Sequence, residues 1–68
     1  MNEYKVSLAA ARVNAGFNQR DAAEKLGICL ATLVNWETGR TFPTARKIQL
    51  LCNLYEVPLN SLKILPKG

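Results

Sequence analysis

Few side chains in this chain of 68 residues could carry out chemistry. Histidine, the commonest general base and a common zinc ligand, is absent. The two cysteines, Cys29 and Cys52, have no C-x-x-C partner, and two thiols cannot complete a tetrahedral zinc site. No paired nucleophile and base is visible, and no glycine-rich loop could cradle a phosphate. We therefore expect a protein that is not an enzyme and that needs no metal ion or cofactor.

The charged residues favour a polyanionic partner. Nine basic and five acidic residues give a net charge of +4, although many small soluble proteins are equally basic. The distribution says more than the total, because residues 38–55 contain no acid and three cations, Arg40, Arg46 and Lys47. A phosphate-binding site and an ordinary solvated basic face explain this run equally well.

Length and composition indicate one small globular domain over residues 1–68. The chain is 49% hydrophobic and 21% charged, as in ordinary folded proteins. No apolar run approaches the roughly 18 residues that span a bilayer, and polar residues interrupt any N-terminal signal segment. We expect a cytoplasmic protein without membrane contact, in which a disulfide between the two cysteines is disfavoured. The start at Met1 and the end of the core pattern near Leu65 favour a complete chain.

Hydrophobic periodicity predicts an all-α fold, a compact bundle of five short helices. No run alternates with period two, so no strand is expected. The helices are predicted over residues 5–15, from the N-cap Asn18 to Gly27, over residues 30–38, from the N-cap Thr44 to the approach to Pro58, and over residues 59–65. In the last of these, Leu62 is expected to point back to the core.

The second and third predicted helices each bury one stripe of side chains. These stripes are Ala22, Ala23 and Leu26 in the second helix, and Leu33 and Trp36 in the third. Trp36 could instead be a stacking platform, but its register favours the core. The third helix then leaves an outer face without charge, formed by Leu30, Ala31, Thr32, Val34 and Asn35. A helix needs such a face if it lies against base edges rather than water.

Two short helices joined by a tight glycine-containing turn are the layout of a DNA-reading helix-turn-helix unit, which we expect over residues 18–40. With its residues placed, the chain resembles the lambda-repressor/Cro-like family of helix-turn-helix DNA-binding domains over residues 8–62. The matching residues are, in order, Leu8, Arg12, Asn18, Gln19, Ala23, Leu26, Gly27, Ile28, Thr32, Leu33, Trp36, Glu37, Gly39, Arg40, Pro43, Ile48, Leu51, Cys52, Tyr55, Val57 and Leu62.

The resemblance implies that the third helix enters the major groove of double-stranded DNA. The positions that match base-contacting residues are Leu30, Ala31, Thr32 and Asn35. The positions that match contacts to the DNA backbone are Asn18, Gln19 and Arg40. Arg12 and Glu37 match an ion pair that ties the first helix to the end of the third.

Each assignment has a structural alternative. Asn35 could be an ordinary exposed residue, but an amide side chain pairs bidentately with adenine. Leu30 and Ala31 could belong to the core, but the inner face of their helix is already occupied. Gln19 is expected to point outward at a helix N-terminus, which is a favourable place for a phosphate. Simple helix-start chemistry explains Gln19 as well.

Two features depart from the family pattern. Cys29 stands where the family usually has Ser or Thr to cap the third helix, and a thiol is a weak acceptor. This substitution puts the start of that helix at Leu30 in question. The groove face also lacks an Arg or Lys for guanine, so we expect specificity that is modest, A·T-leaning or dependent on DNA shape and dimer geometry.

We expect a sequence-specific transcriptional regulator of the phage or prokaryotic Cro/repressor type, bound to operator half-sites as a homodimer. The dimer surface is predicted at the C-terminal end, where Leu59, Ile64 and Leu65 are more apolar than a closing helix needs. Leu50 and Leu54 lie off the core stripe, and all of these residues could also complete the core. The alternative is a protein-interaction module, such as the antitoxin of a toxin–antitoxin pair, although no extended tail is present to wrap a toxin.

Overall fold

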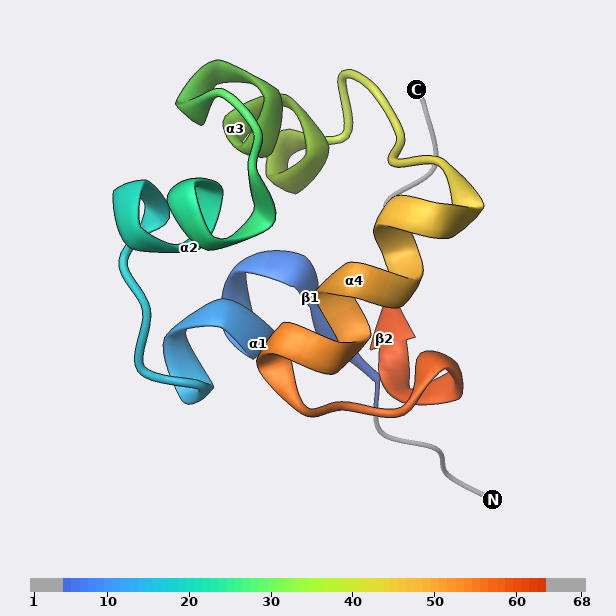
Figure 1. The fold of residues 1–68 in the computed structure, drawn as a ribbon. Helices are drawn as coiled ribbons and strands as arrows, with labels where there is room; N and C mark the ends of the chain where they lie inside the picture. The colour runs from blue at the N-terminus through green and yellow to red at the C-terminus, as the bar shows by residue number, and fades with distance from the viewer. Residues whose placement is uncertain (1–4, 64–68) are drawn as a thin grey trace.

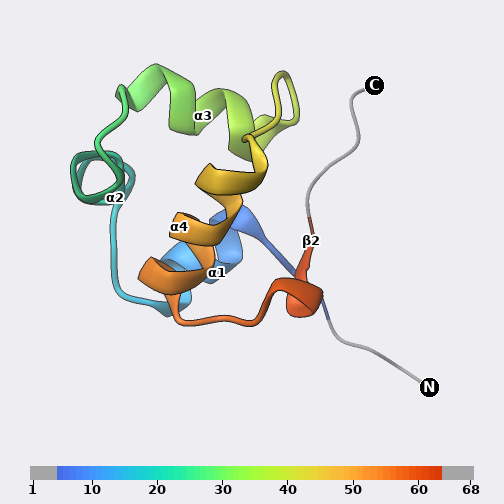
Figure 2. The ribbon, with the colours of Figure 1, turned by 45° about the vertical axis from the view of Figure 1, so that its right-hand side comes forward.

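The computed structural model describes residues 5–63, which form four α-helices, one 3-10 turn and two short strands (Figure 1). The helices are α1 (Leu8–Asn14), α2 (Gln19–Leu26), α3 (Leu30–Thr38) and α4 (Ala45–Tyr55). The 3-10 turn η1 (Leu59–Ser61) lies between α4 and β2 (Leu62–Lys63), and β1 (Val6–Ser7) precedes α1. Figure 2 shows α2 end-on, with α3 running across the top of the molecule.

The segment after α4 departs from the predicted bundle of five helices. In place of a helix over residues 59–65, η1 makes one short turn and β2 follows, while residues 64 and 65 lie outside the described part of the chain. Leu62 is extended and pairs in parallel with Val6. The prediction of a strand-free chain is therefore wrong, because a strand of two residues is too short to show an alternating pattern. Leu62 still reaches the core as predicted and is 6% exposed.

Side-chain caps set where three of the helices begin. Oγ of Ser7, Oδ1 of Asn18 and Oγ1 of Thr44 each accept the backbone N–H three positions later, at 3.0, 2.7 and 3.3 Å. Such caps satisfy N–H groups that have no partner within the helix. They confirm the predicted caps Asn18 and Thr44. The first helix starts at Leu8 rather than at residue 5, because Ser7 caps it and Val6 belongs to β1.

The helices α2, α3 and α4 end at residues in the left-handed conformation. Gly27 (φ +71°) ends α2 and Gly39 (φ +83°) ends α3. Glycine adopts this conformation without a steric penalty, so both glycines act as helix stops. Glu56 (φ +57°) ends α4 and is the one non-glycine residue of positive φ among residues 5–63. A Cβ at such a position costs conformational energy.

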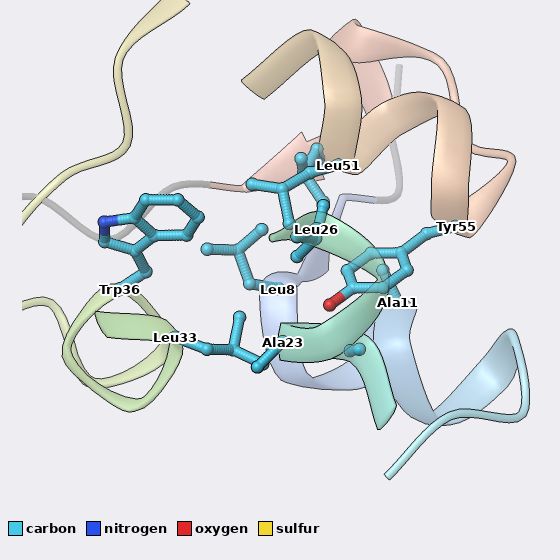
Figure 3. Packing of buried hydrophobic residues seen from close by; sticks show 10 residues of the cluster. Leu8, Ala11, Ala23, Leu26, Leu33, Trp36, Leu51 and Tyr55 are labelled. Carbon is cyan, nitrogen blue, oxygen red and sulfur yellow. The ribbon is translucent and has the colours of Figure 1, made fainter. Parts of the chain in front are cut away.

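One hydrophobic core joins all four α-helices and β2 (Figure 3). Leu33 of α3 and Leu51 of α4 are the largest fully buried side chains. In Figure 3, Trp36 lies toward one end of the core and Tyr55 toward the other, with leucines between them. The buried hydrophobic residues are Leu8, Ala11, Ala22, Ala23, Leu26, Leu33, Trp36, Leu51, Tyr55 and Leu62. The predicted inner stripes of the second and third helices are thus confirmed.

The longest described helix, α4, has 11 residues. No helix within residues 5–63 is long and apolar enough to cross a membrane. The same residues contain no group of three His, Cys, Asp or Glu side chains placed to hold a metal ion.

Candidate nucleic-acid interface

The outer face of α3 carries the uncharged surface that the sequence predicted for the third helix. On the inner side, Leu33 is completely buried and Trp36 is 6% exposed. The four predicted base-contacting positions lie on the rest of the helix, where Leu30 and Ala31 are exposed and Thr32 and Asn35 are half-buried. Leu30 and Ala31 are therefore not core residues. Their alternative assignment is excluded, and they remain available to a partner.

The turn from α2 to α3 ends at Cys29, which is the N-cap of α3. Cys29 is extended (φ −73°, ψ 150°), and its side chain makes no capping hydrogen bond. Its carbonyl accepts the N–H groups of Thr32 at 3.0 Å and of Leu33 at 3.2 Å. The helix consequently begins at Leu30 as predicted, without the side-chain cap that Ser or Thr would supply. Cys29 and Cys52 are both free thiols, and Cys29 is exposed.

Backbone hydrogen bonds hold Arg40 close to Asn35 at the end of α3. The carbonyl of Asn35 accepts the N–H of Arg40 at 2.9 Å, after Gly39 has turned the chain. The side-chain amide of Asn35 makes no hydrogen bond to any residue within 5–63. Its donor and acceptor groups are therefore free for a ligand. Arg40 is exposed beside it.

Arg12 and Glu37 come together between α1 and the last turn of α3. Nε of Arg12 donates to Oε2 of Glu37 at 2.8 Å, and the side chains are 12% and 5% exposed. Arg12 also donates from Nη1 to the carbonyl of Phe17 at 2.9 Å. The pair thus fixes α3 and the loop between α1 and α2 to α1. Removal of one partner would leave the other charge nearly buried and unpaired, which is costly.

Gln19 is not free in the way that the sequence predicted. Its side chain was expected to point outward, but Nε2 donates to Oε1 of Glu37 at 2.9 Å. The contact between Oε1 of Glu37 and Nη2 of Arg12 is long, at 3.5 Å. Oε1 can therefore accept a stronger hydrogen bond, and it accepts one from the amide of Gln19. Gln19 is half-buried at the first position of α2. A contact between Gln19 and DNA would have to use the second N–H or the oxygen of this amide, because the first N–H is bonded to Glu37.

A helix-turn-helix family model of the Cro/C1 type matches residues 8–62. The chain belongs to this helix-turn-helix (HTH) family. The match confirms the resemblance, and it makes the chain a DNA-binding HTH domain of a family that is generally without enzymatic activity. Comparison with curated proteins and with solved structures finds no match.

Tyr55 is a core residue of the HTH domain whose pKa is affected by the charges of the Arg12–Glu37 pair. Its hydroxyl is buried without a hydrogen-bond partner among residues 5–63, and its ring lies 6.3 Å from that of Phe17. Burial raises the pKa of Tyr55 to about 12; the negative charge of Glu37 adds to this rise and the positive charge of Arg12 opposes it. The phenol is therefore neutral at ordinary pH. Burial likewise raises the pKa of the Cys52 thiol.

The structure also places Asn18, the first residue of the HTH motif, and two cations that follow the motif in α4. Asn18 is exposed, but its Oδ1 accepts the N–H of Asp21, so its amide NH₂ group is what remains for DNA. Arg46 is exposed and Lys47 is half-buried in the first turn of α4, which follows the loop after α3. The sequence prediction counted both cations but did not assign them to the contact set. The cap Thr44, which places them at a helix start, is the signal that could have included them.

Proposed function

We propose that this HTH domain is a sequence-specific transcriptional regulator that reads the major groove of DNA with α3. The observation that carries the proposal is the outer face of α3, which is accessible and has no charged side chain between Leu30 and Asn35. The major groove, about 12 Å wide, admits an α-helix and displays a different pattern for each base pair. The apolar and amide side chains of this face match the methyl groups, donors and acceptors of the base edges better than they match water.

The contacts follow from the chemistry of each side chain. The free amide of Asn35 matches N6 and N7 of adenine, and Leu30 and Ala31 match thymine methyl groups. Thr32 adds a hydroxyl that can either donate or accept. Since α3 offers no Arg or Lys to guanine, the preferred site is rich in A·T pairs. The contacts proposed for the DNA backbone come from Asn18, Gln19 and Arg40.

The proposal includes a homodimer, because a domain this small makes few contacts as a monomer. Leu59, one of the predicted dimer residues, is 64% exposed. It borders a hollow of about 260 Å³ that is lined also by Ala45, Ile48, Gln49 and Cys52. Leu50 is 40% exposed, whereas Leu54 packs against the core. Ile64 and Leu65 lie outside the described residues. A two-fold dimer would read half-sites about 34 Å apart.

We infer a phage or prokaryotic repressor of the Cro type, which would meet its operator in the cytoplasm. The family match supports this inference only as far as DNA binding and regulation. Exposed Leu30 and Ala31 would also suit the surface of a protein-interaction module such as an antitoxin. The two functions differ in the force that holds the partner, because DNA is held largely by charge and a protein partner by burial of apolar side chains.

Selection of bound sequences from random DNA tests the proposal directly. We expect a recurring, two-fold symmetric site with half-sites about 10 base pairs apart. Affinity for that site should fall steeply between 50 and 200 mM salt, because phosphate contacts release counterions. Selection that returns no recurring half-site would contradict a specific regulator. A partner protein whose binding barely responds to salt would favour the interaction module.

A further inference from the structure

The hydrogen bond between Gln19 and Glu37 joins the start of α2 to the last turn of α3. Glu37 is not a freely moving acceptor. Oε2 is held by Nε of Arg12 at 2.8 Å, and Arg12 is held in turn by the carbonyl of Phe17 at 2.9 Å. With the Glu37 side chain 5% exposed, the carboxylate has little room to change its position. Gln19 therefore has a fixed partner.

A carboxylate can orient a glutamine amide in one way only. Ionised Glu accepts hydrogen bonds and donates none, whereas the amide of Gln has a donor end and an acceptor end. Only the NH₂ group of Gln19 can face Glu37, because the reverse orientation would put two acceptor oxygens together. One hydrogen on Nε2 is used at 2.9 Å from Oε1 of Glu37. The second hydrogen on Nε2 is left for another acceptor.

We propose that Glu37 is a positioning residue for the DNA contact of Gln19, and that it holds the free N–H of this amide ready for a DNA phosphate. The inference rests on the proposed function and adds a residue that does not itself touch DNA. A phosphate only accepts, so an amide that could turn either way would present the wrong group part of the time. An amide ordered before binding also loses less rotamer freedom in the complex.

The test measures what Gln19→Ala costs in the presence and absence of the carboxylate. The variant Arg12→Met/Glu37→Leu removes both charges together and leaves the net charge of the chain unchanged. Replacement of a buried pair by apolar side chains is often neutral or stabilising, unlike removal of one partner. Glu37→Asp gives a second background, because it keeps a charge for Arg12 but shortens the side chain that reaches Gln19. Circular dichroism selects the backgrounds that are folded.

On the DNA site selected by the wild-type domain, Gln19→Ala should weaken binding about tenfold, as expected for one hydrogen bond to a charged group. In the Arg12→Met/Glu37→Leu background the same substitution should change the affinity less than twofold, and in Glu37→Asp the loss should be smaller than in the wild type. Equal losses in all folded backgrounds would overturn the inference, since Glu37 would then matter only for the fold.

Chemically modified DNA gives a readout that a purely structural role would not change. An uncharged methylphosphonate at the phosphate facing Gln19 should weaken wild-type binding. The Arg12→Met/Glu37→Leu domain should lose sensitivity at that one position and keep it at the phosphates near Arg40. Retained sensitivity at the Gln19 position overturns the inference. A wild-type domain that selects no DNA site overturns the proposed function and this inference together, whereas equal losses on a selected site overturn this inference alone.

Discussion

The carboxylate of Glu37 receives hydrogen bonds from two other helices, through Arg12 of α1 and Gln19 of α2. The sequence indicated the first partner, because Arg12 and Glu37 have opposite charges at positions that match the family. It placed Gln19 correctly at the first position of α2 but missed its hydrogen bond to Glu37, because rules for helix starts consider only neighbouring residues. The partner of Gln19 is 18 positions away, and a hydrogen bond over that separation leaves no local pattern.

Substitution of Asn35 can distinguish sequence-specific binding, through the proposed base contact, from binding to any DNA. Asn35→Ala should weaken binding to the selected site by about 1–3 kcal/mol, because it removes a bidentate amide–adenine contact. Binding to unrelated DNA should be unchanged, since that binding depends on phosphate contacts. Fluorescence anisotropy on the two DNAs measures both affinities. A similar loss on both would contradict a base contact.

Tyr55 makes the stability of the domain sensitive to high pH. Its pKa rises from 10.0 to about 12 on folding, so the unfolded chain loses the phenolic proton first. The stability linked to this group is complete below pH 10 and is lost as the pH rises toward 12. Tyr55→Phe should remove that part of the loss of stability and keep the stability at pH 7, because it deletes a hydroxyl that has no partner among residues 5–63. Urea unfolding of both proteins at pH 7 and about pH 11 tests this; identical losses would contradict it.

At the scale of secondary structure, elements with local signals were predicted well and the others were not. The bounds of α3 and the caps Asn18 and Thr44 agree with the structure, because cap residues and core stripes are readable within one helical turn. The strands β1 and β2 were missed since each has two residues and depends on the other across the whole chain. The outer face of α3 could be predicted like its inner face, because helical periodicity separates the two. The ligand of the outer face could not be predicted in this way, because it lies outside the chain.

The end of α4 offers a substitution that should stabilise the domain. Glu56 is exposed and in the left-handed conformation (φ +57°, ψ 48°), where a Cβ costs about 1–2 kcal/mol. Glu56→Gly should raise the free energy of unfolding by up to about 1 kcal/mol, because glycine avoids this cost but loses more backbone entropy. Glu56→Ala is the matched control, because it keeps the Cβ and removes the charge. An equal gain in both variants would point to charge rather than conformation.

At the scale of the whole molecule, substitutions at Leu59 and Leu62 allow dimer formation and folding to be tested separately. Leu59 is 64% exposed, whereas Leu62 is 6% exposed in the core. Leu59→Lys should weaken the proposed dimer and leave the unfolding of the monomer unchanged. Leu62→Ala should instead destabilise the fold by about 2–5 kcal/mol. Analytical ultracentrifugation and urea unfolding measure the two effects, and a Leu59→Lys protein that dimerises like the wild type would exclude this surface.

The pairing of β1 with β2 has a consequence for the order in which the domain folds. Val6 meets Leu62, so their contact closes a loop of nearly the whole described chain at an entropic cost of about 3.5 kcal/mol. Contacts between neighbouring helices close shorter loops and should form first. Val6→Gly should therefore leave the refolding rate in stopped-flow experiments nearly unchanged and accelerate unfolding. The two ends of the domain would then be the last parts to come together and the first to separate.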